Sequence, residues 1–185
     1  MLTTYTINTI RFLVKRMSGA SKVAEGRDAG DSENVCQILQ GHTRWVTSVS
    51  FSLDGFRIVS GSSSRSKAMR VWDAVSAQCV VGPLVSHRDA NRLGPLEGHI
   101  GGTWSVSFSP NGLYVVSGGA DNNVVVWDAY TGGLVRTLRG HTDDVNSVSF
   151  SVDNGRIVSG SDDETVQVWD ANNYTHVRTL EGHTE

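Results

Sequence analysis

The stretch GHTDDVNSVSFSVDNGRIVSGSDDETVQVWDA, from Gly140 to Ala171, decides the fold of this chain. A second version, GHIGGTWSVSFSPNGLYVVSGGADNNVVVWDA, lies 42 residues earlier, from Gly98 to Ala129. A third, GHTRWVTSVSFSLDGFRIVSG, begins at Gly41 and reaches its own tryptophan at Trp72. A period of roughly 40–45 residues with Gly-His at one end and Trp-Asp at the other predicts a repeated unit of short β-strands.

Within the third repeat, alternating residues and turn residues predict four strands. They are expected at Val145–Ser151, Arg156–Gly160, Thr165–Asp170 and His176–Leu180. In the first of them the bulky residues share one face and the serines share the other, because side chains alternate along a strand. Sheets of this kind interlock when both faces are buried against neighbouring sheets.

The Gly-His and Trp-Asp pairs at this period resemble the WD-repeat family of β-propellers, over residues 35–185. The resemblance implies an all-β fold: a partial propeller of about three four-stranded antiparallel blades, with strands a to d, plus the start of another. Val35–Leu39 resembles a strand d whose own blade is missing. Propellers have roughly four to eight blades. The array is therefore expected not to close alone and to self-associate through its open blade edges.

The chain divides into a non-repeat part, residues 1–34, and the repeat array, residues 35–185. The repeats cover about residues 39–84, 96–137 and 138–179, followed by a fragment at 180–185. Ile10, Leu13, Val14 and Met17 would share one face of a short helix. Residues 1–22 carry basic but no acidic side chains, as in a mitochondrial presequence. We favour a disordered leader or a piece of another domain, and a cytoplasmic location.

Polar residues recur at constant spacing inside the apolar pattern of two repeats. These structural tetrads are His99, Ser117, Asp121 and Trp127, and His141, Ser159, Asp163 and Trp169. In WD-repeat proteins these positions form hydrogen bonds from Trp to Ser, from Ser to His and between His and Asp, and the resemblance implies the same here. A buried polar group left unpaired would cost about 1–3 kcal/mol.

Serine, histidine and aspartate also make up a hydrolase triad, which is the weakest functional alternative. Such a triad would occur here in duplicate, with each hydroxyl already bound to a tryptophan. The sequence has no phosphate-binding Gly-Lys-Ser/Thr loop, no His-Glu-x-x-His and no Cys-x-x-Cys. We therefore expect no enzyme, no catalytic residues, no metal and no cofactor.

The first repeat departs from this pattern. Ser60 and Trp72 are 12 residues apart instead of 10, and Ser66 stands where the tetrad aspartate is expected. His42 is therefore predicted to lack a carboxylate partner. The surrounding serine run indicates a longer turn between strands b and c, and a phosphorylation site is the alternative.

A second irregularity covers residues 81–99. The pattern Gly-Pro-Leu-x-x-His occurs there twice, at Gly82–His87 and Gly94–His99. We interpret the segment as the scar of a blade deleted between His87 and Asp89. A long loop between strands d and a is the alternative.

Residues that differ between otherwise similar repeats are the candidates for partner binding. They lie near the start of strand a or in strand c: Arg44, Trp45, Arg70, Trp104, Asp143, Asp144 and Gln167. An indole beside charges of both signs favours a protein or peptide over a polyanion. Ordinary drift at exposed positions is the alternative, and Trp104 would equally suit packing between blades.

The closeness of the copies resembles the arrays of fungal NACHT-linked WD-repeat proteins, whose propeller is the sensor or partner-binding end of a signalling NTPase. This implies an intracellular, non-catalytic interaction scaffold or sensor that binds a protein or peptide on the propeller's top face. The net charge of −3 and the lack of a long apolar run predict neither nucleic-acid nor membrane binding. The alternative is a truncated piece, or a faulty gene prediction, of a larger NACHT-type protein without independent function.

Overall fold

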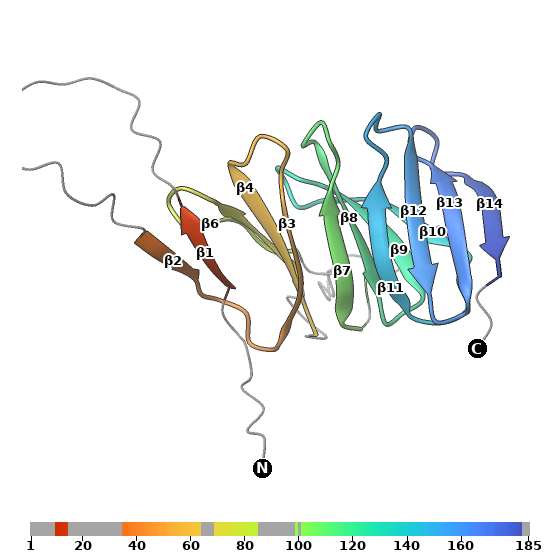
Figure 1. The fold of residues 1–185 in the computed structure, drawn as a ribbon, viewed down its shortest axis with the longest axis horizontal. Helices are drawn as coiled ribbons and strands as arrows, with labels where there is room; N and C mark the ends of the chain where they lie inside the picture. The colour runs from red at the N-terminus through yellow and green to blue at the C-terminus, as the bar shows by residue number, and fades with distance from the viewer. Residues whose placement is uncertain (1–9, 15–34, 64–68, 85–98, 100, 183–185) are drawn as a thin grey trace, which may run out of the picture.

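A computed structural model describes residues 10–14, 35–63, 69–84, 99 and 101–182 of the chain. All of the regular structure in these residues is β-strand. Three four-stranded antiparallel sheets stand side by side as blades, and a separate two-stranded sheet lies beside the first of them (Figure 1). The expected all-β, unclosed propeller of three blades is confirmed.

Each blade runs through four consecutive strands, a to d. Blade 1 consists of β3 (Val46–Phe51), β4 (Arg57–Ser62), β5 (Met69–Asp73) and β6 (Cys79–Leu84). Blade 2 consists of β7 (Thr103–Phe108), β8 (Tyr114–Gly119), β9 (Asn123–Asp128) and β10 (Leu134–Arg139). Blade 3 consists of β11 (Val145–Phe150), β12 (Arg156–Ser161), β13 (Thr165–Asp170) and β14 (His176–Glu181). The four strands predicted in the third repeat agree with these bounds to within one residue.

The two-stranded sheet joins β1 (Ile10–Val14) to β2 (Val35–Leu39), with Ile10 opposite Leu39. The strand at Val35–Leu39 was predicted, but the short helix that would have included Ile10, Leu13 and Val14 was wrong. The segment IRFLV is rich in residues that favour strands, and β2 offers it an edge for backbone hydrogen bonds. Met17, the fourth residue of that predicted face, lies outside the described residues.

The two ends of each blade are tied differently. At one end, here called the d–a end, the loop from strand d to strand a is bonded to the b–c turn, as when the Ser63 N–H donates to the Trp45 carbonyl (3.0 Å). At the other, the a–b end, the a–b turn is bonded to the c–d turn, as when the Ala74 N–H donates to the Phe56 carbonyl (2.8 Å). The corresponding bonds recur in blades 2 and 3, so the two ends present different loops on a constant frame.

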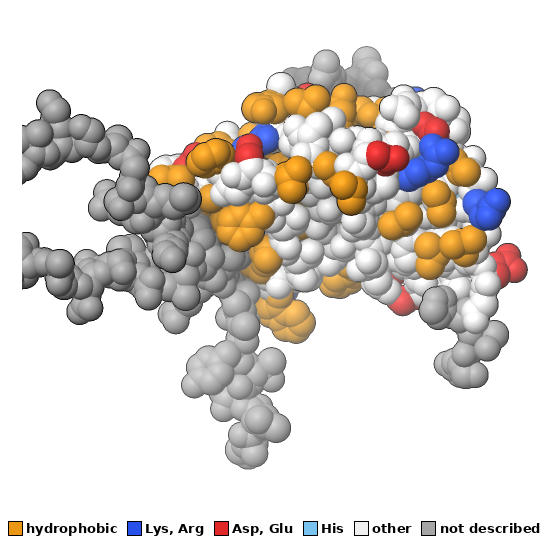
Figure 2. Space-filling view, turned by 45° about the horizontal axis from the view of Figure 1, so that its top comes forward, with side chains coloured by type: hydrophobic (Ala, Val, Ile, Leu, Met, Phe, Trp, Pro, Cys, Tyr) orange, Lys and Arg blue, Asp and Glu red, His pale blue; other side chains and the backbone are white. Residues whose placement is uncertain are grey.

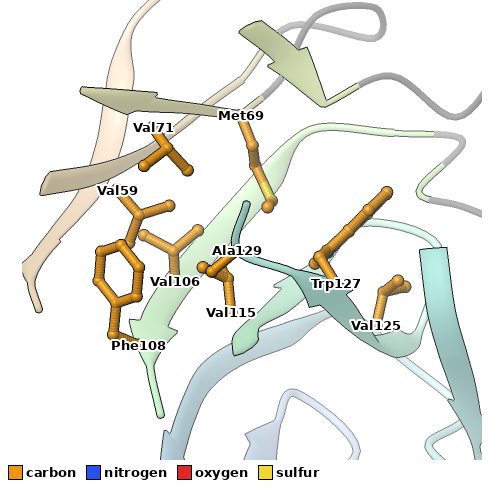
Figure 3. Packing of buried hydrophobic residues seen from close by; sticks show 9 residues of the cluster. All are labelled: Val59, Met69, Val71, Val106, Phe108, Val115, Val125, Trp127 and Ala129. Carbon is orange, nitrogen blue, oxygen red and sulfur yellow. The ribbon is translucent and has the colours of Figure 1, made fainter. Parts of the chain in front are cut away.

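The hydrophobic core lies between the blades. We call the face of a blade that looks toward the next blade its leading face, and the opposite face its trailing face. Figure 3 shows the first core, in which Val59, Met69 and Val71 of blade 1 pack against Val106, Phe108, Val115, Val125, Trp127 and Ala129 of blade 2. The second core joins Val116, Val124, Val126 and Leu138 of blade 2 to Val145, Val148, Ile157 and Trp169 of blade 3. A smaller cluster places Leu39 of β2 with Ile58, Trp72 and Ala74 of blade 1.

Close approach of neighbouring blades depends on the glycine that follows each tetrad serine. A Cβ atom at Gly118 would lie 2.6 Å from Val145 Cγ1 and 3.0 Å from Val148 Cγ1, distances that only a glycine avoids. The serines on the small face of strand a also bind the next blade, because the Val148 N–H donates to Ser105 Oγ (3.2 Å). The same bond joins the Val106 N–H to Ser48 Oγ (3.1 Å) in the preceding interface.

Candidate functional site: the tetrads and the d–a end

The tetrad of blade 2 is a continuous chain of side-chain hydrogen bonds. Trp127 Nε1 donates to Ser117 Oγ (2.8 Å), Ser117 Oγ lies 2.8 Å from His99 Nε2, and His99 Nδ1 lies 2.7 Å from Asp121 Oδ1. A neutral His99 protonated on Nδ1 satisfies every member, because the indole donates to the hydroxyl, the hydroxyl donates to Nε2 and Nδ1–H donates to the carboxylate. This series of hydrogen bonds joins strands b and c to the d–a loop.

Blade 3 repeats this geometry. Trp169 Nε1 donates to Ser159 Oγ (2.9 Å), which lies 2.8 Å from His141 Nε2, and His141 Nδ1 lies 2.7 Å from Asp163 Oδ2. Burial raises the pKa of Asp163, but hydrogen bonds from the Thr165 side chain, the Thr142 N–H and His141 lower it more. The net pKa lies well below its ordinary value, so Asp163 stays ionised and holds His141 in place.

Blade 1 has only part of this chain. Trp72 Nε1 donates to Ser60 Oγ (2.8 Å), and Ser60 Oγ lies 2.6 Å from His42 Nε2. His42 Nδ1 is buried and finds no partner among the described residues. Burial and then the nearby Arg70 charge lower the pKa of His42 to about 4, so the imidazole is neutral near pH 7. The predicted lack of a carboxylate agrees with this geometry, although Ser66 lies outside the described residues.

The tetrad serines are poorly placed for chemistry on a substrate. Ser117 and Ser159 are buried, and each accepts a hydrogen bond from a tryptophan. The described part of the chain contains no group of three or more His, Cys, Asp or Glu residues arranged to hold a metal ion. Nor does it contain a helix long and apolar enough to cross a membrane.

The d–a end of blade 1 presents two exposed residues of the predicted partner-binding set. Arg44 is exposed, and Trp45 is 58% exposed although tryptophan is usually buried. Their loop is held by the bond from the Ser63 N–H to the Trp45 carbonyl. A large indole is therefore displayed on a fixed backbone.

Trp104, Asp143 and Asp144 lie at the d–a end where blades 2 and 3 meet. Trp104 Nε1 donates to Asp144 Oδ2 (2.9 Å) across the two blades, which leaves Trp104 partly buried. Asp143 is exposed, and its side chain accepts the Asp144 N–H (2.8 Å). The structure thus brings these three together, with Trp104 acting first as a contact between blades.

Arg70 and Gln167 lie beneath the loops. Arg70 Nη2 donates to the Gly41 carbonyl (2.9 Å), and its guanidinium lies 5.7 Å from the centre of the Trp72 ring. Gln167 was expected beside the partner-binding residues but is buried. The reason is the two-residue period of a strand, which puts Gln167 on the same face as Trp169, and in blade 3 this trailing face is covered by blade 2.

The sequence analysis missed a set of apolar residues at the a–b end. Six large hydrophobic side chains are exposed in its turns: Leu53, Phe56, Val75, Leu113, Tyr130 and Val152. Figure 2 turns this end toward the viewer and shows orange side chains gathered along it. The available signal was apolar residues inside turn sequences such as SLDGF and SPNGL, where polar residues are usual.

The repeat geometry agrees with a comparison against known families. The model of the WD domain, G-beta repeat, matches residues 33–73, 90–128 and 132–170. The chain belongs to the WD40 repeat family. This WD40 chain is 32% identical over 99 residues to eukaryotic translation initiation factor 3 subunit I of Aspergillus terreus, covering 54% of the chain and 25% of that protein. It is 35% identical over 95 residues to the same subunit of Schizosaccharomyces pombe, covering 51% of the chain and 24% of that protein.

Solved structures give the same family. The crystal structure of the RRP9 WD40 repeats superposes with a TM-score of 0.70 and 25% identity, covering 80% of this chain and 42% of that one. The structure of U3-55K superposes with a TM-score of 0.70 and 26% identity, covering 80% and 43%. The WD40 chain spans about a quarter of the curated relatives above. The resemblance to NACHT-linked arrays remains a sequence-based expectation.

The difference between complete and partial tetrads predicts unequal effects of the same substitution. We expect His141→Ala to lower the free energy of unfolding of blade 3 by about 1–3 kcal/mol, because Ser159 and Asp163 each lose one of their buried hydrogen bonds. His42→Ala should cost less, because its Nδ1 atom bonds to nothing among the described residues. Hydrogen exchange of the strand c amides near Trp169 and Trp72 measures both effects. Equal losses of protection in the two blades would contradict the prediction.

Proposed function

We propose that this WD40 chain is a non-catalytic interaction scaffold or sensor that binds a protein or peptide at its d–a end. The observation that carries the proposal is Trp45, an exposed indole on a loop held by backbone hydrogen bonds. Tryptophan and arginine dominate the energetic centres of protein interfaces. An anchor that is already ordered loses little conformational entropy on binding.

The charges of the d–a end favour a protein or peptide partner. Arg44 supplies a cation at blade 1, whereas Asp143, Asp162 and Glu164 supply exposed carboxylates at blade 3. Binding of a nucleic acid through its phosphates needs a concentration of basic side chains, which the described residues of this end do not offer. A partner with an apolar residue between charges of opposite sign would match it.

The similarity to translation initiation factor subunits supports a role as one component of a larger assembly. A soluble intracellular location, in a fungus, would accord with those relatives. The alternative of a piece of a longer NACHT-type protein remains open, and the binding surface proposed here would then serve that protein. The hydrolase alternative is not favoured, because Ser117 and Ser159 are buried and bonded to tryptophans.

Peptides selected by display on the immobilised full chain provide a test of the d–a end. We expect Arg44→Ala together with Trp45→Ala to weaken binding of a selected peptide by about tenfold or more, since residues of these types commonly contribute over 1 kcal/mol. The readout is the dissociation constant by calorimetry, with circular dichroism to show that the fold is kept.

Two matched controls separate this surface from the rest of the molecule. Phe56→Ala removes an exposed aromatic ring at the a–b end, and Arg178→Ala removes an exposed cation from the outer strand β14. Neither should change the affinity. A peptide that loses affinity with Phe56→Ala but not with the Arg44 and Trp45 pair would move the binding site to the a–b end.

A further inference from the structure

The a–b end of blades 1 and 2 carries four exposed apolar residues in neighbouring turns. We call them the apolar strip: Phe56, Val75, Leu113 and Tyr130. In each blade the a–b turn and the c–d turn are tied together, because the Ala74 N–H donates to the Phe56 carbonyl (2.8 Å) and the Ala129 N–H donates to the Leu113 carbonyl (2.9 Å). Each blade therefore presents two apolar residues from turns that touch.

Arg57 connects the two halves of the strip. It directly follows Phe56, and its Nη2 atom donates to the Gly112 carbonyl (2.6 Å), next to Leu113. Its Cζ atom lies 4.4 Å from the centre of the Tyr130 ring. The strip is therefore one surface across two blades, at the end of the molecule that Figure 2 turns toward the viewer.

Blade 3 shows that the turns themselves do not require apolar residues at these positions. Gly155 and Asn172 take the two places that Phe56 and Val75 take in blade 1. The bond between the turns is kept, because the Ala171 N–H still donates to the Gly155 carbonyl (3.1 Å). The fold thus leaves the residue type free here, and apolar residues gathered on an exposed surface are typical of an interaction site.

The backbone of the strip is held in place residue by residue. Each of the four residues donates its N–H to a side-chain oxygen of the Asp or Asn two positions earlier, as in Asx turns. These bonds, of 2.9–3.0 Å, run from Phe56 to Asp54, from Val75 to Asp73, from Leu113 to Asn111 and from Tyr130 to Asp128. Apolar side chains on an ordered backbone lose little conformational entropy when a partner binds.

Three of these four acceptors are carboxylates, which gives the strip an anionic border. Hydrogen bonds, chiefly from Ser52 to Asp54, from the Ser76 N–H to Asp73 and from the Thr131 N–H to Asp128, hold the pKa of each carboxyl below its ordinary value. All three aspartates are therefore ionised near pH 7. Against them, the four turns of the strip contribute a single cation, Arg57.

We propose that the apolar strip is a second interaction surface, which binds a peptide segment with apolar side chains flanked by lysine or arginine. The apolar side chains of the segment would cover Phe56 and Tyr130, and its cations would meet the carboxylates at the border. An acidic segment or an anionic membrane would face like charges instead. The strip lies at the opposite end of the blades from Arg44 and Trp45, so this proposal does not rest on the proposed function.

Peptide display on variants of the full chain tests the strip without interference from the d–a end. The immobilised chain carries Arg44→Ala and Trp45→Ala, and the library is first depleted on a chain that also carries Phe56→Ser and Tyr130→Ser. We expect the recovered peptides to combine apolar with basic residues. A synthetic copy of the most enriched peptide is then the probe for calorimetry with the unaltered chain.

Single substitutions assign the affinity to particular side chains. Phe56→Ala and Tyr130→Ala should each raise the dissociation constant by about tenfold or more. Circular dichroism shows whether each variant keeps its fold, and Val75→Ser takes the place of either one that loses its β-sheet spectrum. The Arg44→Ala, Trp45→Ala chain should bind the probe as tightly as the unaltered chain, so a failure of the d–a surface and a failure of the strip give different results.

A matched pair of substitutions tests the charge at the border. Asp54→Asn should raise the dissociation constant by about two- to fivefold, with the turn intact because Asn111 already accepts the same bond in blade 2. Asp153→Asn makes the same change in blade 3, where the carboxylate accepts the Gly155 N–H (2.9 Å), and should have no effect. Added NaCl should weaken binding of the probe to the unaltered chain, because it screens the attraction between charges.

Three results would overturn the proposal. They are a selection that returns no peptides or acidic ones, an affinity that both Phe56→Ala and Tyr130→Ala leave unchanged, and equal effects of Asp54→Asn and Asp153→Asn. Binding of the chain to vesicles of phosphatidylcholine and phosphatidylserine, lost with Phe56→Ala, would assign the strip to a lipid surface instead. Self-association lost with the same variant would assign it to a second copy, and either outcome contradicts a basic peptide as the partner.

Discussion

Replacing Trp127 with alanine should be the most destabilising single change in the described core, at about 3–5 kcal/mol. The side chain is almost fully buried between blades 1 and 2, in the cluster with Val115 and Met69. Its Nε1 also donates to Ser117 Oγ, so its removal leaves a cavity and also removes a buried hydrogen bond that the hydroxyl accepts. The midpoint and slope of urea unfolding measure the loss.

Two comparison variants separate packing from hydrogen bonding at this position. Trp127→Phe keeps most of the apolar contact and loses only the indole donor, so we expect a smaller cost of about 1–3 kcal/mol. Tyr130→Ala removes an exposed aromatic residue nearby in the same blade and should cost about 1 kcal/mol or less. A Trp127→Ala protein as stable as Tyr130→Ala would contradict the assignment of Trp127 to the core.

Acid should destabilise blade 1 through His42 in a defined range of pH. The pKa of His42 is lowered to about 4 in the folded chain, from 6.5, by burial and then by Arg70. Protonation therefore favours the unfolded state, and the stability associated with neutral His42 is complete above pH 6.5 and is lost as the pH falls toward 4. The expected loss is roughly 3 kcal/mol by linkage.

Urea unfolding of the full chain and of His42→Gln between pH 7 and pH 4 measures this effect. The unaltered chain should lose more stability across the range than the variant, whose amide does not titrate. The aspartates with lowered pKa values, such as Asp54 and Asp128, begin to lose their contribution as the pH falls below about 5, but they do so in both proteins, so the difference between the two profiles reports His42. Parallel pH profiles for the two proteins would contradict the role given to His42.

Much of the fold could be predicted because the same pattern of strands and turns occurs three times in the sequence. The strands of blade 3 lie within a residue of the predicted ranges, since alternation and turn residues are local properties of the chain. The tetrad residues could likewise be selected in advance, because His141, Ser159 and Trp169 keep one spacing relative to His99, Ser117 and Trp127. The short helix expected near Ile10 was wrong, because its partner strand β2 lies more than twenty residues away along the chain.

The candidate binding surface was only partly predictable. Arg44 and Trp45 are exposed at the d–a end as expected, but Gln167 is buried and Trp104 bonds to Asp144 across two blades. Comparison of the repeats identifies the positions at which their residues differ. It does not show whether such a position faces solvent or the neighbouring blade, because that depends on how the sheets stack.

The sequence alone determined the repeated unit, the strand order within it and the polar residues that each blade must pair. These features follow from the spacing of residues along the chain, which does not depend on how the blades pack in space. Only the tertiary structure decided which faces are covered. Val116 and Val158 occupy the same place in nearly identical repeats, yet one is fully buried and the other exposed. The physical reason is that an apolar side chain on the face of a blade is removed from water only where a second blade packs against that face.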